Sequence, residues 1–233
     1  MRVLAAVLFA LLAATVMASP RTSDAQTKRP TAGYPRAEQP MYGGIPANPV
    51  EQENDRRYIE EATRLAGDRG RAANMATDLG FRYFFRGDLA GAIRRFNQAW
   101  LLDQENGDAY HGMALVVFDR DDDRAAAEQL FKTALAKSST SIGAWSDYGR
   151  MLAIAGRVRE SVDVLDGALK RAFPGNPNPE GAANARALLA MGLAELREFP
   201  RACREARAVP PEAQKPLLQG AAQVLALQEC KGV

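Results

Sequence analysis

Residues able to carry out catalysis or bind a metal are few in this chain of 233 residues. It has one histidine, His111, and two cysteines, Cys203 and Cys230. A structural zinc site takes four Cys or His ligands, so a site built on the histidine would need carboxylates to complete it. The sequence also lacks the local motifs of zinc proteases, serine hydrolases and phosphate-binding loops. We therefore expect a protein that is not an enzyme and that uses neither a cofactor nor a metal.

An acidic run at Asp119–Asp123 is the cluster most similar to a calcium-binding loop. An EF-hand loop has Gly at its sixth position and a bidentate Glu at its twelfth. Counted from Asp119, these positions hold Arg124 and Leu130. We interpret the run as a solvated turn that caps the following helix.

The two cysteines lie close to the C-terminus and have two interpretations. In an oxidising compartment an even number of cysteines favours a disulfide. The alternative is a pair of buried free thiols that pack as small hydrophobic side chains. The export signal described next favours a bridge between Cys203 and Cys230, which would tie the last helix to the one before it. No Cys-x-x-Cys spacing indicates a redox enzyme.

The first residues have the features of an export signal. Arg2 supplies a positive charge, and Val3–Val16 contain neither a charge nor a proline. This apolar run has about 14 residues, whereas about 20 are needed to span a bilayer. Small residues predict a cleaved signal peptide over 1–18 or, alternatively, up to residue 25.

The localisation follows from that signal. No cysteine comes directly after the apolar run, which argues against a bacterial lipoprotein. We predict a bacterial protein that is periplasmic or secreted, with no membrane span in the mature chain. The formal net charge of +2 gives no electrostatic reason to expect a nucleic-acid partner, because such binding depends on clustered Lys and Arg.

Residues 19–48 read as a flexible linker. They contain five prolines and several glycines, and no apolar period runs through them. The cluster Met41–Gly44 is interpreted as a turn, with an apolar anchor that docks on the folded domain as the alternative. An N-terminal helix is predicted over 49–69, capped by Asn48.

The rest of the chain, 70–233, shows a repeated pattern. Gly80, Ala114 and Gly149 lie 34 and 35 residues apart, and each begins a similar series of small and large residues. In the first copy the series is Gly80, Tyr83, Gly87-Asp88, Ala92, Phe96 and Ala99. A period of about 34 residues with this layout is typical of a solenoid of helical hairpins.

These positions resemble the tetratricopeptide repeat family. Copies are assigned to 73–106, 107–141 and 142–175, a degenerate copy to 180–209, and a C-terminal capping helix to 212–230. The second copy has one extra residue in its turn, and the third has Ser161 where Ala is usual. The resemblance implies an all-α fold, a right-handed α-solenoid of antiparallel helix hairpins.

The resemblance also implies where a partner would bind. In this family certain positions of the first helix of each repeat line the concave groove. Carried over residue by residue, the positions proposed to bind a partner here are Thr77, Phe81, Phe84, His111, Leu115, Phe118, Ser146 and Arg150. Phe85 occupies a further lining position of the first copy. Large apolar groups such as Phe81 and Phe118 are unfavourable in water, so a partner or the chain's own N-terminal segment should cover them.

The functional hypothesis is a non-enzymatic scaffold of the bacterial cell envelope that binds a peptide or helix of a protein partner in this groove. Two alternatives stay open. One is a self-associating structural component, and the other is an accessory or assembly factor of a pilus or secretion system. The sequence determines neither the partner nor the oligomeric state.

Overall fold

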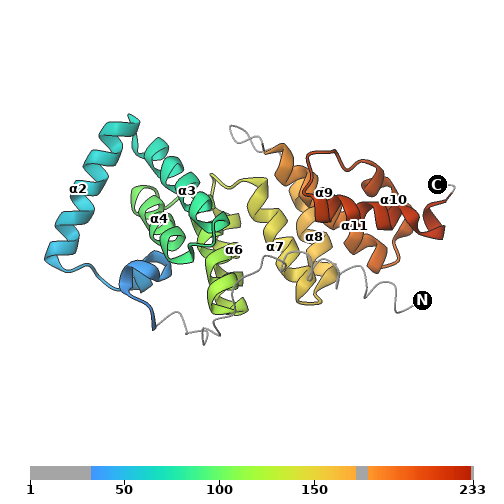
Figure 1. Cartoon of the computed structure of the whole chain (residues 1–233), viewed down its shortest axis with the longest axis horizontal. Helices are drawn as coiled ribbons and strands as arrows, with labels where there is room; N and C mark the ends of the chain where they lie inside the picture. The colour runs from blue at the N-terminus through green and yellow to red at the C-terminus, as the bar shows by residue number, and fades with distance from the viewer. Residues whose placement is uncertain (1–32, 172–177, 232–233) are drawn as a thin grey trace. The chain divides into compact units, whose positions relative to one another are not determined.

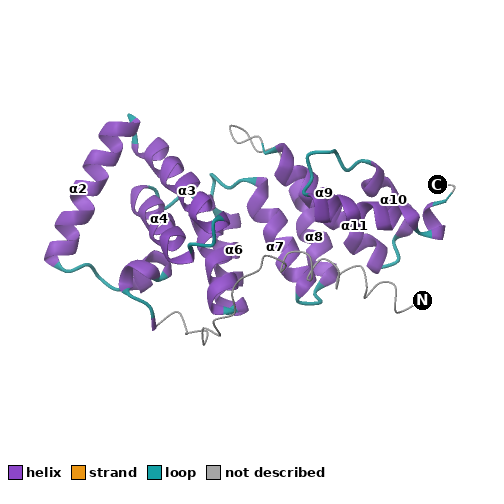
Figure 2. Ribbon diagram, in the orientation of Figure 1, coloured by secondary structure: helices purple, strands orange, loops and turns teal. Residues whose placement is uncertain are grey.

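The computed structural model describes residues 33–171 and 178–231, and all the secondary-structure elements in these ranges are helices (Figures 1 and 2). The all-α prediction is confirmed. The signal peptide and the part of the linker before residue 33 lie outside the described residues. Contacts divide the chain into two compact units, the N-terminal unit (33–140) and the C-terminal unit (141–231), which are described separately. Among the described helices, none has the length and apolarity to cross a bilayer.

The N-terminal unit consists of a first helix and two helical hairpins. α2 (Pro49–Ala66) precedes the hairpin of α3 (Arg69–Phe85) and α4 (Leu89–Leu102). The second hairpin is formed by α5 (Gly107–Val116), the π-helix η4 (Val117–Asp121) and α6 (Arg124–Ala136). α3 packs on α4 and α5 on α6, as the repeat predicts (Figure 1).

Each of these α-helices begins at an Asn or Asp whose side chain accepts a hydrogen bond from a backbone N–H of the first turn. These bonds satisfy donors that a helix leaves unpaired at its start. The five caps are Asn48, Asp68, Asp88, Asn106 and Asp123. Asn48 belongs to a complete capping box, because Glu51 accepts from its backbone N–H in return.

Glycines of the first helices allow the hairpins to pack closely around one ring. Phe96 of α4 is fully buried. A Cβ added to Gly80 of α3 would lie 2.5 Å from Phe96 Cε1, and a Cβ added to Gly112 of α5 would lie closer still. The repeat's small position at Gly80 is therefore required by Phe96.

The extra residue of the second copy is held in η4. The hydrogen bonds of a π-helix join residues i and i+5, one residue further apart than in an α-helix, so a π-turn accommodates an extra residue. Asp122 follows with φ +56°, a left-handed conformation, and Asp123 then caps α6 through a hydrogen bond from Ala126 N–H at 2.9 Å.

The N-terminal segment (33–48) is ordered and docked, which differs from the flexible linker predicted there. It forms two short 3-10 helices, η2 (Arg36–Glu38) and η3 (Pro40–Gly44), beside α4 (Figure 1). Asn97 of α4 is fully buried and donates from Nδ2 to the carbonyl oxygens of Ala37 at 2.9 Å and Gln39 at 2.8 Å.

Two arginines contact the same segment at Tyr34 and Glu38. Arg120 donates to the Glu38 carbonyl oxygen at 3.0 Å, and its guanidinium carbon lies 3.6 Å from the centre of the Tyr34 ring. Arg94 forms an ion pair with the Glu38 carboxylate at 2.6 Å. The segment thus contacts the second helix of the first hairpin and the turn of the second.

Tyr42 is the apolar anchor of the segment. Its ring is buried, with its centroid 6.2 Å from that of Trp100. Burial raises the pKa of Tyr42 to about 12, and the negative charge of Asp55 contributes in the same direction.

The C-terminal unit contains two further hairpins and a last helix. Its elements are α7 (Ile142–Ile154), α8 (Val158–Leu169), α9 (Pro179–Glu195), α10 (Phe199–Arg207), α11 (Lys215–Ala226) and the short 3-10 helix η5 (Gln228–Cys230). α9 contacts each of the other four α-helices.

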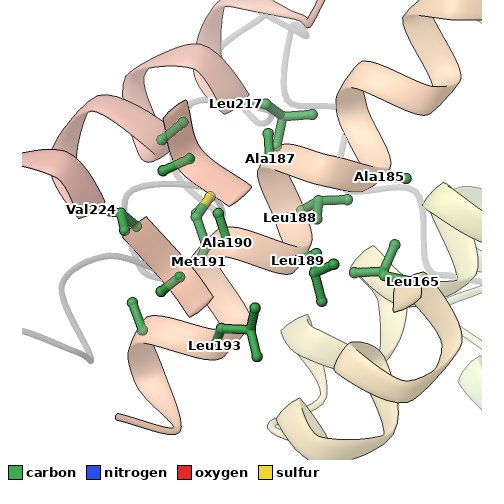
Figure 3. Packing of buried hydrophobic residues seen from close by; sticks show 14 of the residues in the cluster. Leu165, Ala185, Ala187, Leu188, Leu189, Ala190, Met191, Leu193, Leu217 and Val224 are labelled. Carbon is green, nitrogen blue, oxygen red and sulfur yellow. The ribbon is translucent and has the colours of Figure 1, made fainter. Parts of the chain in front are cut away.

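The core of this unit gathers around α9. Leu188, Leu189 and Met191 are at most 2% exposed, and Leu165 of α8 points toward Leu189 (Figure 3). Ser161, which departs from the repeat pattern, is buried and donates from Oγ to the Gly149 carbonyl oxygen at 2.8 Å. Its hydroxyl is satisfied, so the substitution is compatible with the core.

The structure joins Cys203 of α10 to Cys230 of η5 in a disulfide. Arg207 supports the same end of the chain by donating to the Cys230 carbonyl oxygen at 2.9 Å.

Candidate partner-binding surface

Four of the eight residues predicted to line the groove are buried. Thr77, His111, Leu115 and Ser146 are each 4–5% exposed. Thr77 donates from Oγ1 to the Ala73 carbonyl oxygen at 2.9 Å, inside its own helix. The prediction that these side chains offer an open surface to a partner is wrong, because they form part of the packed interior.

His111 has an aromatic environment. Its ring centroid lies 5.3 Å from that of Phe81 and 5.9 Å from that of Phe131. At 4% exposure the imidazole presents almost no surface to solvent, so its contacts are with rings of the protein rather than with a bound segment.

The other four predicted residues keep part of their surface. Phe81, Phe84, Phe118 and Arg150 are half-buried. Arg150 forms an ion pair with Asp147 at 3.1 Å within α7, and with Ser146 it belongs to the C-terminal unit. The remaining three lie in the N-terminal unit, on α3 and η4.

Three phenylalanines at the C-terminal end of α3 form a continuous surface, which we call the aromatic patch (Phe81, Phe84 and Phe85). Phe85 stacks near Phe81, with centroids 6.3 Å apart, and meets Phe84 edge-on at 5.6 Å. Phe81 in turn contacts the buried Phe96 edge-on at 5.1 Å. Within the described ranges, no ring contact joins Phe118 to the patch.

Phe85 is the most exposed part of this patch, at 76%. The packing of the repeat does not account for it, because a helix-end residue could be polar without loss of core contacts. An exposed ring that lies against two other rings adds to a contiguous apolar surface, which is the property of an anchor site for another chain.

Chemistry other than binding finds no support in the side chains around the patch. Across the described parts of the chain, no group of three or more His, Cys, Asp or Glu residues lies close enough to hold a metal ion. The charged residues near the patch on α3 and the following turn are two arginines, Arg82 and Arg86, and two aspartates, Asp78 and Asp88, all exposed.

Comparison with solved structures identifies the fold. A structure of PilF from Pseudomonas aeruginosa superposes with a TM-score of 0.57 at 21% identity, over 68% of this chain and 69% of that one. The chain has a tetratricopeptide-type fold. YrrB, a tetratricopeptide repeat protein with an unusual peptide-binding site, gives a TM-score of 0.48 at 19% identity over 76% of this chain and 85% of its own. No protein-family model and no curated protein sequence matches.

Within this tetratricopeptide-type fold, the residues that sequence reasoning missed are those that dock the N-terminal segment. Asn97 lies on α4 among core residues, and its amide was not recognised as a binding group. A polar amide one residue after the core position Phe96 was the available signal, since a buried amide requires hydrogen-bond partners. Its partners, two backbone carbonyls near residue 38, have no sequence signature.

Proposed function

We propose that this protein is a non-enzymatic scaffold that binds an apolar segment of another protein on the aromatic patch. The carrying observation is the exposed ring of Phe85, supported by Phe81 and Phe84. A helix-based fold holds these rings on a rigid element, so little order has to be gained when a partner binds.

The chemistry of the patch favours a particular kind of segment. Three phenylalanine rings offer apolar area to an aliphatic or aromatic anchor residue. Arg82 and Arg86 flank them, and neither forms an ion pair with any described residue. A partner segment with an apolar anchor between acidic residues would complement both features.

The N-terminal segment does not occupy this patch. Its contacts are with α4, through Asn97 and Trp100, and with Arg120. The patch lies on α3, so docking of the chain's own segment leaves Phe85 accessible. This arrangement supports a partner from outside the chain as the occupant.

We further propose that the protein works in the bacterial cell envelope, in the periplasm or outside the cell. The apolar run at Val3–Val16 and the disulfide between Cys203 and Cys230 support an exported protein, because disulfides persist in oxidising compartments. Sequencing the N-terminus of the protein recovered from the periplasm tests this. A mature chain that starts at Ser19 or Gln26 is expected, and an uncleaved chain that stays in the cytoplasm would contradict it.

The binding proposal is tested with Phe85→Ser and a matched control, Leu65→Ser. Both residues are large, apolar and exposed, at 76% and 67%, but Leu65 lies on α2 outside the patch. Wild type and both variants are cross-linked to envelope proteins, and recovered proteins are quantified by mass spectrometry.

We expect a set of proteins captured by wild type and by L65S but lost with F85S. Neither substitution should reduce thermal stability by more than a few tenths of a kcal/mol, because neither side chain is in the core. Equal recovery with all three proteins would remove the patch from the proposed function.

A further inference from the structure

One face of α3 carries four exposed residues in a heptad-like spacing, which we call the α3 seam (Met75, Asp78, Arg82 and Phe85). The steps between them are three, four and three residues, so the side chains lie along one side of the helix. Met75 is 60% exposed and Phe85 76%. This is the spacing of the a and d positions through which helices pair in coiled coils.

No described element covers the seam. α3 packs on its neighbours through the opposite side, where Ala73, Thr77 and Gly80 are buried. α2 reaches the Ala72–Ala76 part of α3 through Tyr58, Ile59, Ala62 and Ala66, and diverges from α3 along the rest of its length (Figure 1). Asp78 and Arg82 form no ion pair with each other or with any other described residue.

We propose that the seam pairs with the same seam of a second copy of this chain, as two antiparallel helices related by a two-fold axis that crosses the seam at the level of Gly80 along α3. The sequence of the seam is symmetric about that position. Met75 and Phe85 stand five residues to either side of it, and Asp78 and Arg82 stand two residues to either side.

Antiparallel pairing in this register brings unlike partners together. Met75 of one copy packs on Phe85 of the other, and Asp78 of one copy faces Arg82 of the other. A two-fold axis makes each contact occur twice, so the interface has two apolar layers and two ion pairs. A position a opposite a position d is also the layer that antiparallel coiled coils form.

This symmetry is the reason to favour a second copy over an unrelated helix. Parallel pairing of two copies would set Asp78 against Asp78 and Arg82 against Arg82, and like charges would oppose it. An unrelated partner would require complementarity to the seam but no symmetry within it. Opposite charges at equal distances from one central residue satisfy the condition for an interface that a chain makes with itself.

The contact is expected to be weak. One pair of helices covers less area than the 1,200–2,000 Å² or so that stable interfaces bury. Asp78 and Arg82 are exposed in the single chain, so salt screens the charges that draw two copies together. We therefore expect a dimer in rapid exchange with monomer, whose fraction rises with protein concentration and falls with added salt.

Charge reversal tests the register. In D78R both seam charges are positive, and in R82D both are negative, so each variant alone should dimerise about tenfold more weakly than wild type. The double variant D78R/R82D exchanges the two charges and should regain wild-type association. An equimolar mixture of D78R with R82D should associate more tightly than either variant alone. Sedimentation equilibrium over a range of concentrations measures all four.

Arg124→Asp serves as the matched control. Arg124 is an exposed arginine on α6 in the same unit, and its reversal changes the net charge as R82D does. R124D alone should dimerise like wild type, and its mixture with D78R should show no gain. Circular dichroism of each variant establishes that the helices are retained.

The proposal is overturned if wild type sediments as a monomer at every concentration. It is equally overturned if the D78R and R82D mixture associates no better than its components, or if R124D rescues D78R as well as R82D does. Phe85 and Arg82 belong both to the seam and to the surface proposed to bind a partner, so a second copy and a partner protein would compete for them. D78R separates the two proposals, because Asp78 lies outside the aromatic patch: it should weaken the dimer and leave capture of the proteins lost with F85S unchanged.

Discussion

Replacement of Gly80 by alanine should destabilise the N-terminal unit, although alanine is the better helix former. In an unhindered helix the change gains about 1 kcal/mol. Here the new Cβ would lie 2.5 Å from Phe96 Cε1, against an ordinary contact of about 3.5–4 Å. Overpacking of this kind costs about 1–3 kcal/mol. Phe96 cannot easily move away, because it is fully buried and contacts Phe81 edge-on. Because Phe96 has little room to move, we expect the upper part of this range, about 2–3 kcal/mol, which after the gain of about 1 kcal/mol leaves a net loss of about 1–2 kcal/mol.

Gly70 of the same helix provides the control. A Cβ there would meet only Asp68 Oδ1 at 3.4 Å, which is ordinary contact, so Gly70→Ala should be neutral or should stabilise by up to about 1 kcal/mol. Urea unfolding followed by circular dichroism gives both values. A second variant, Gly80→Ala with Phe96→Leu, should show favourable coupling of about 1 kcal/mol or more, because leucine lacks the ring atoms that clash. A G80A protein as stable as G70A, or no coupling with F96L, would refute this account of the repeat's small position.

Three further predictions concern the segments at the two ends of the chain. Asn97→Ala removes both hydrogen bonds to the N-terminal segment and should reduce the free energy of docking by about 1–3 kcal/mol. Trypsin should therefore cut after Arg36 roughly five- to 150-fold faster. An unchanged rate would show that Asn97 does not hold the segment. The pKa of Tyr42 is about 12 when the segment is docked and about 10 when it is free, so docking should be unaffected by pH below 10 and should weaken between pH 10 and 12, where the free tyrosine ionises first. The part of the 295 nm absorbance that Tyr42→Phe removes should titrate near pH 12. A midpoint near 10 would contradict burial of the ring. Reduction of the Cys203–Cys230 bridge, which closes a separation of 27 residues, should lower the stability of the C-terminal unit by about 3–4 kcal/mol in urea unfolding, and Cys203→Ser/Cys230→Ser should lose all sensitivity to reductant.

The hairpins could be predicted from sequence because each depends on local and periodic information. Small residues at Gly80 and Ala92 mark where two helices approach, and Gly87-Asp88 marks the turn and the next cap. Asn48 and Pro49 indicate the start of α2 for the same reason, since a cap acts within one turn of its own helix. These signals do not require knowledge of distant parts of the chain.

Exposure of the groove positions could not be predicted in this way. Thr77 and Leu115 occupy positions that the family resemblance places in the groove, yet both are buried. Burial is decided by how closely neighbouring helices approach, which depends on the side chains of several helices together. Phe85, at the end of α3, has fewer neighbours and stays exposed as its place at the helix end suggests.

Docking of the N-terminal segment could not be predicted for a different reason. Its prolines and glycines exclude a regular helix or strand, and composition alone cannot distinguish an irregular docked segment from a free one. Docking depends on Asn97 and Arg120, which lie about 60 and 80 residues further along the chain. Long-range pairings of backbone carbonyls with side chains leave no period to detect.

The π-turn at Val117–Asp121 and the cap at Asp123 have a consequence for how such a chain can change over time. Because each of α2 to α6 begins at its own Asn or Asp cap, the start of each helix is fixed locally, and a residue added in one turn need not change where the next helix begins. The start of α6 is fixed by the cap at Asp123 and does not depend on the number of residues that follow Gly107 at the start of α5. Gains or losses of single residues between helices are therefore locally contained, and copies of unequal length can descend from one ancestral hairpin and still stack.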